Sequence, residues 1–124
     1  MLVHGEYLRA ITRDDLLVYH LEQDYTQADL EPVERAMLEY AVKLNGRPGE
    51  VGEQDLEPLR AAGFDDIGIM DIVMVVSLFN FMNRVSDGLG AQTEASMEKS
   101  RERGEKRAQD LLQQASTPSK QAQG

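Results

Sequence analysis

The chain has 124 residues, and its 13 lysines and arginines against 22 aspartates and glutamates give a formal charge of −9 at pH 7. This acidic balance argues against a nucleic-acid partner, because affinity for a phosphate backbone comes from clustered basic side chains. The sequence contains no cysteine, which excludes disulfides, thiolate metal sites and cysteine nucleophiles within these residues. At this length we expect one domain or part of one.

Helical periodicity dominates the sequence and no segment alternates as a strand would, so we expect an all-α protein. A first helix covers residues 1–11 and begins without an N-terminal cap. Thr12, followed by two aspartates, is typical of an N-cap with acids in the first turn, and it opens a short helix that reaches His20. Residues 22–30 form a polar connection.

Three further helices are expected in the middle of the chain. Pro32 fits the first turn of a helix that is stopped by an Asn-Gly-Arg-Pro-Gly sequence. A short helix is predicted over residues 53–62, with a kink or a wide turn at Pro58, because a proline inside a helix removes a backbone hydrogen bond. Asp65 caps a long helix that continues to about Ser86.

The long helix after Asp65 is apolar on more than one side. One stripe consists of Ile69, Ile72, Val73, Val76 and Phe79, and another of Ile67, Met70, Met74, Phe81 and Val85. A helix that is apolar all round must be covered, so neighbouring subunits or further sequence would supply the cover. Its longest uncharged stretch, between Asp71 and Arg84, is 12 residues. Because a bilayer span needs roughly 18 apolar residues, we predict a buried helix and no membrane anchor.

Charge and composition change near residue 90. Residues 1–90 carry a net charge of −10, whereas residues 91–124 carry +1 and are rich in Gln, Ser, Ala, Glu, Lys and Arg. We therefore predict a helical domain over residues 1–90 and a polar tail over residues 91–124. Charge pairs favour a frayed helix over residues 94–114, and the end is predicted to be disordered because it has too little apolar surface to bury.

Three polar side chains interrupt the apolar surface of the long helix. Asn80, Asn83 and Asp87 follow one another at helical spacing. These side chains could form a structural hydrogen-bond network with Arg84, or they could line a reactive pocket. We favour the network, because buried amides must find hydrogen-bond partners. No His, Asp or Glu spacing predicts a metal site.

Three segments together resemble a known family: HGEYLRAIT at residues 4–12, ERAMLEYAVKL at 34–44 and FNFMNRVSDGLG at 79–90. They resemble the peroxidase-related branch of the carboxymuconolactone decarboxylase and alkylhydroperoxidase D-like (AhpD-like) superfamily. The AGF sequence at residues 62–64, followed by an acidic cap and an Ile-rich helix, is similar to that branch as well. The order and spacing agree over residues 4–90.

The resemblance implies an all-α subunit, here the C-terminal part of the AhpD-like fold, that assembles into homo-oligomers. It also implies an antioxidant oxidoreductase chemistry, in which a Cys-x-x-Cys pair reduces a peroxide and a dithiol reductant restores the pair. In the family motif the second cysteine is followed by three residues and then by His-Gly-Glu. The sequence His4-Gly5-Glu6 matches this end of the motif. The resemblance therefore implies that His4 is a catalytic residue and that it acts as a proton relay. Both cysteines and the upstream relay carboxylate would precede Met1.

We therefore expect no thiol peroxidase activity from this chain as printed. Either the true reading frame begins upstream of Met1, which we favour, or the gene is a truncated member that keeps only an assembly surface. The alternative from another class is a non-catalytic helical oligomerisation or interaction module. Without the resemblance, His4 would be read as an exposed residue near a chain end. We expect a cytoplasmic homo-oligomer, no cofactor and no metal, with a peroxide and a dithiol reductant as partners of any longer form.

Overall fold

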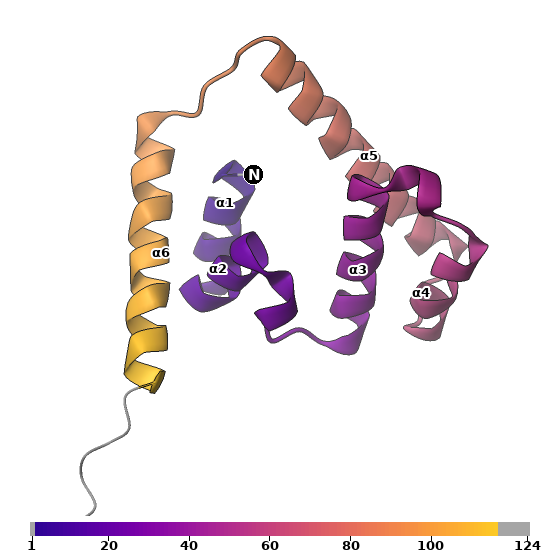
Figure 1. The fold of residues 1–124 in the computed structure, drawn as a ribbon, viewed down its shortest axis with the longest axis horizontal. Coiled ribbons are helices and arrows are strands. Elements are labelled where there is room, and N and C mark those ends of the chain that lie inside the picture. The colour runs from indigo at the N-terminus through magenta and orange to yellow at the C-terminus, as the bar shows by residue number, and fades with distance from the viewer. Residues whose placement is uncertain (1, 117–124) are drawn as a thin grey trace, which may run out of the picture. The chain divides into compact units, whose positions relative to one another are not determined.

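The computed structural model describes residues 2–116, with side chains from residue 4 onward, and these residues form helices and short 3₁₀ turns without a strand. The all-α prediction is confirmed. Figure 1 shows the course of the chain. The described residues divide into two compact units, which are treated separately here: unit 1 comprises residues 2–29 and 92–116, and unit 2 comprises residues 30–91. The predicted disordered end follows residue 114; residues 115 and 116 are helical, and residues 117–124 lie outside the described residues.

Unit 1 contains three helices, α1 (Leu2–Thr12), α2 (Asp15–Gln23) and α6 (Ala95–Ser116). The predicted cap of α2 is shifted by two residues, because Asp14 and not Thr12 accepts the hydrogen bond from the backbone N–H of Leu17, at 2.9 Å. Thr12 closes the preceding turn, since its hydroxyl accepts from the N–H of Asp14 at 3.2 Å and donates to the carbonyl of Leu8. The polar connection after α2 contains a 3₁₀ turn, η1 (Tyr25–Gln27).

Helix α6 packs along α1 and α2, as Figure 1 shows, and does not stand free. The predicted frayed helix is a regular helix of 22 residues. Its contact face is made of small residues: Gly104 is buried and Ala108 is fully buried. Val18 of α2 is 1% exposed in the same unit. The structure therefore groups residues 92–116 with the first helices, whereas the charge pattern suggested a separate tail.

Unit 2 consists of α3 (Pro32–Gly46), two 3₁₀ turns, η2 (Pro48–Glu50) and η3 (Glu53–Asp55), α4 (Glu57–Ala61) and α5 (Asp66–Gly88). Tyr40, Leu59, Ile69 and Ile72 form its core. The predicted helix over residues 53–62 is divided into η3 and α4, so Pro58 stands in the first turn of α4. No mid-helix kink is needed, because a proline in the first helical turn removes an N–H that has no helical partner.

Helix α5 begins as predicted, since the carboxylate of Asp65 accepts a hydrogen bond from the N–H of Gly68 at 2.8 Å. Ile69 and Ile72 are the only buried residues of α5, so this chain does not itself cover the helix, and the expected cover by neighbouring subunits or further sequence stays a prediction. Among the described residues, α5 is the one helix that is long and apolar enough to cross a membrane, by length and composition only. A single such helix is weak evidence of a span.

Candidate functional site

His4, the residue assigned as a proton relay by resemblance, is exposed and lies in the first turn of α1. The two residues that follow it face inward. A Cβ built on Gly5 would collide with a carboxylate oxygen of Glu22 and would lie 3.8 Å from Val18 of α2, so α1 and α2 approach closely at this glycine. The side chain of Glu6 is 21% exposed and contacts two partners, Arg9 and Ser100.

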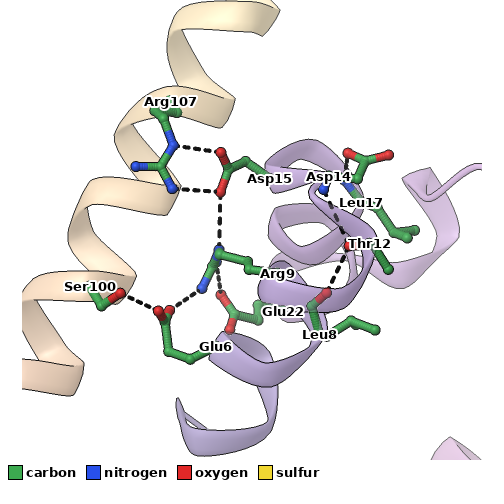
Figure 2. Close-up of polar contacts among 10 residues, drawn as sticks. All are labelled: Glu6, Leu8, Arg9, Thr12, Asp14, Asp15, Leu17, Glu22, Ser100 and Arg107. Atoms are coloured by element: carbon green, nitrogen blue, oxygen red, sulfur yellow. Dashed lines mark hydrogen bonds and ion pairs between the residues drawn. The ribbon is translucent and has the colours of Figure 1, made fainter.

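Those partners belong to a charged cluster centred on Arg9, shown in Figure 2. Arg9 Nη1 lies 2.6 Å from Glu6 Oε1, and Arg9 Nη2 lies 3.1 Å from Glu22 Oε2. The hydroxyl of Ser100, on α6, donates to the other oxygen of Glu6. Arg9 itself is 8% exposed, so its guanidinium is a buried cation compensated by carboxylates from α1 and α2.

Asp15 joins this cluster to α6. Its carboxylate is 3.5 Å from Arg9 Nε and accepts two hydrogen bonds from Arg107, at 2.5 Å from Nε and 2.9 Å from Nη2. The hydrogen bonds from Arg107 lower the pKa of Asp15, and burial opposes this effect. Such a two-point contact between guanidinium and carboxylate fixes geometry as well as charge.

The cluster therefore has the character of a packing element. The carboxylates of Glu6, Asp15 and Glu22 pair with the guanidiniums of Arg9 and Arg107. Because each carboxylate is already in an ion pair, none of them is an evident catalytic acid or base. Within residues 2–116 no group of three His, Cys, Asp or Glu side chains could hold a metal ion. His4 is the residue here to which the resemblance assigns proton transfer, and its catalytic role stays a prediction.

Sequence reasoning missed most of this cluster. The pair of Glu6 and Arg9 has helical i, i+3 spacing and could have been found as a local charge pair. The contacts of Ser100 and Arg107 join residues 94 and 92 positions apart, respectively, and no local pattern encodes them.

A second candidate lies in unit 2, between the end of α3 and α5. It is an open cavity of about 340 Å³ lined by Leu44, Asn45, Pro48, Val76, Ser77, Asn80, Phe81 and Arg84. Asn80 donates to the carbonyl of Val76 at 3.0 Å, and Arg84 donates to the side-chain oxygen of Asn80 at 3.1 Å. The preferred structural network thus exists between Asn80 and Arg84. Asn83 and Asp87 are exposed.

Comparison with solved structures finds similar chains, two of which are described here. A protein from Ralstonia eutropha JMP134, described as an AhpD core and an uncharacterized peroxidase-related protein, is 32% identical with a TM-score of 0.70. An uncharacterized peroxidase-related protein from Silicibacter sp. TM1040 is 34% identical with a TM-score of 0.73. Each match covers 77% of this chain and 50% of the other, so the chain spans half the length of these relatives. No protein-family model and no curated protein matches the chain.

The all-α fold and the identity shared with these two structures define the class as an AhpD-like helical protein. The chain thus has the AhpD-like helical fold, and the two solved structures that it resembles are described as peroxidase-related proteins.

Proposed function

We propose that this chain carries the proton-relay end of a peroxidase-related AhpD-like site and that, as printed, it does not reduce peroxides. The observation that carries the proposal is the position of His4, exposed in the first turn of α1 while the following Gly-Glu is built into the helix packing. A cysteine one helical turn ahead of His4 would lie on the same side of an extended α1.

The proposed reaction needs two thiols. A cysteine thiolate at a helix N-terminus is stabilised by the free N–H groups and the helix dipole. It attacks the peroxide O–O bond, takes one oxygen as sulfenic acid, and releases an alkoxide that a protonated histidine neutralises. The second thiol then condenses with the sulfenic acid, releasing water and forming a disulfide. A dithiol reductant reopens this disulfide by exchange and is itself oxidised.

The test adds the missing sulfur. A Cys-Ala-Ala-Cys tetrapeptide placed directly before Met1 puts the second cysteine four residues ahead of His4, and a Ser-Ala-Ala-Ser tetrapeptide is the matched control. With cumene hydroperoxide and dithiothreitol, we expect peroxide consumption above background from the cysteine variant only. Adding His4→Ala to the cysteine variant should lower the rate by about 10²-fold or more, since general acid-base groups contribute about 10² to 10⁴.

A second readout separates proton relay from folding. The pH dependence of iodoacetamide alkylation gives the pKa of the introduced thiol, and His4→Ala should raise that pKa if a protonated histidine stabilises the thiolate. Helical far-UV circular dichroism must be kept in every variant. Peroxide consumption by the cysteine-free chain would contradict the proposal. A helical cysteine variant without turnover would favour the alternative of a non-catalytic helical interaction module.

A further inference from the structure

The open cavity between α3 and α5, called the α3–α5 cavity from here on, differs in charge from the rest of unit 2. Residues 30–91 carry 11 acidic and five basic side chains. None of the residues that line the cavity is acidic, and Arg84 supplies the one formal charge among them. The cavity is therefore a positively charged place in an acidic unit, and an anion is the ligand that its charge favours.

Arg84 has no carboxylate partner in the described part of the chain. The ion pairs of unit 2 use the cations of Lys43, Arg47 and Arg60. Nη1 of Arg84 donates instead to two neutral oxygens of Asn80, the backbone carbonyl at 3.2 Å and the side-chain oxygen at 3.1 Å. The positive charge of Arg84 is therefore available to a ligand.

Asn80 fixes the guanidinium of Arg84 in place. Its Nδ2 donates to the carbonyl of Val76 at 3.0 Å, which leaves its Oδ1 to accept from Arg84. Nε and Nη2 of Arg84 make no hydrogen bond to the described residues, because both of its bonds use Nη1. Two parallel N–H groups of a guanidinium match the two oxygens of a carboxylate. A cation that is already held in position loses little side-chain entropy on binding.

Half of the lining is apolar and would cover the body of such a ligand. Leu44, Pro48, Val76 and Phe81 supply this part, and the ring of Phe81 is 62% exposed. The volume of about 340 Å³ is at the lower end of the range for small-molecule sites, about 300–1,000 Å³. With about 30 Å³ for one water molecule, the cavity has room for on the order of ten non-hydrogen atoms. The fitting ligand is therefore small, with a short apolar part.

We propose that the α3–α5 cavity binds a small carboxylate with a short apolar body. Its carboxylate pairs with Arg84, and its apolar part lies against Val76 and Phe81. Inorganic phosphate fits less well, because it has no apolar part and its second charge meets no second cation in the lining. The cavity belongs to unit 2 and His4 belongs to unit 1, so this proposal does not depend on the proposed peroxide chemistry.

The first test compares two probes that differ in charge. Benzoate and benzamide have similar size and shape, but only benzoate is an anion at neutral pH. In a ¹H–¹⁵N NMR titration of the full chain, benzoate should shift the side-chain signals of Arg84 and Asn80, with a Kd on the order of 1 mM, because so small a ligand gains limited free energy. Benzamide should bind about tenfold more weakly or less, since hydrogen bonds to charged groups are the stronger ones. Equal affinities, or shifts confined to unit 1, would overturn the proposal.

The second test separates the cation from the apolar wall. Arg84→Gln should weaken benzoate binding by about tenfold or more and leave benzamide binding unchanged. Phe81→Ala should weaken the binding of both probes alike, because it removes apolar contact and keeps the charge. Arg60→Gln is the matched control, since its guanidinium pairs with Glu57 and Asp66 and does not line the cavity. Equal losses in the two arginine variants would refute a role of Arg84 in binding.

Two further measurements keep the result unambiguous. Far-UV circular dichroism must show that each variant stays helical, and if Arg84→Gln unfolds, the comparison of the two probes on the unsubstituted chain decides by itself. Inorganic phosphate is the competitor. Benzoate binding that persists at an equal concentration of phosphate supports a site for an apolar carboxylate, whereas displacement by phosphate would show a general anion site and contradict the proposal.

Discussion

Gly104 of α6 lies directly against the guanidinium of Arg9 on α1. A Cβ built on Gly104 would be 2.8 Å from Arg9 Cζ and 3.0 Å from Arg9 Cδ, closer than side-chain carbons approach one another. The absence of a side chain at this glycine thus gives the buried arginine its space. Because Arg9 also binds carboxylates of α1 and α2, the position of α6 depends on one small residue and one charged cluster.

Replacing Gly104 by alanine should loosen the contact between α6 and α1. Alanine gains about 1 kcal/mol over glycine in helix propensity, but forcing extra volume into a packed contact costs about 1–3 kcal/mol. We expect a net loss, measured as a lower urea midpoint by circular dichroism and as faster tryptic cleavage within α6. Gly88→Ala is the matched control, because its Cβ position has no neighbour within 4 Å beyond the adjacent residues and the backbone of its own helix. Equal behaviour of both variants would show that the guanidinium moves aside freely.

Replacing Arg9 by methionine should destabilise unit 1 strongly. Glu6, Asp15 and Glu22 would lose the buried cation that faces all three, and removing one partner of a buried ion pair costs about 3–5 kcal/mol. The measurement is urea unfolding of the full chain.

The control for this change is Arg47→Met. Its ion pair with Glu50 is 65% and 62% exposed, and exposed pairs contribute about 0–1 kcal/mol. A small effect of Arg9→Met, similar to that of Arg47→Met, would mean that solvent reaches the cluster and screens its charges.

The local signals in the sequence predicted most helices. Asp65 caps α5 and Pro32 opens α3 as expected, because both effects act within one helical turn. A kink or a wide turn was expected at Pro58 inside one helix. The structure instead divides the segment into η3 and α4, and because α4 starts later than the apolar pattern suggests, the proline stands in its first turn.

The packing of α6 could not be predicted in this way. Charge pairs predicted a frayed helix over residues 94–114, but the composition gave no sign that it packs, because the contact uses Gly104 and Ala108, which bring helix backbones close without large side chains. The bidentate contact between Arg107 and Asp15 depends on where the chain returns in space. For the candidate site, the family resemblance supplied His4, whereas the charged cluster beside it emerged only from the structure.

Replacing Leu59 by alanine should destabilise unit 2. Leu59 is 0% exposed and belongs to the core with Tyr40 and Ile69, so the substitution leaves a cavity and costs about 2–5 kcal/mol. Leu111→Ala, at a site 49% exposed on α6, should cost much less. Thermal unfolding of both variants checks the difference, and similar melting temperatures would mean that unit 2 repacks around the lost side chain.

Acid should weaken the attachment of α6 through Asp15. The hydrogen bonds from Arg107 hold the pKa of Asp15 below its usual value, so the folded state favours the charged carboxylate more than the unfolded chain does. This stabilisation is fully present above the unfolded pKa, about 3.9, and is lost as the pH falls through the lower folded value. We therefore expect the loss below about pH 4.

The variant Asp15→Asn tests this pH dependence. At neutral pH it should be less stable than the unsubstituted chain, because the neutral amide no longer pairs with Arg107 and Arg9. Below about pH 4 the difference should shrink, since the native carboxylate becomes protonated as well. Asp110→Asn, at an exposed site on α6, is the control and should leave the pH profile unchanged. A constant difference between Asp15→Asn and the unsubstituted chain from pH 7 to pH 2 would exclude the ionised Asp15 as the source, because its proton uptake is what makes the contact depend on pH.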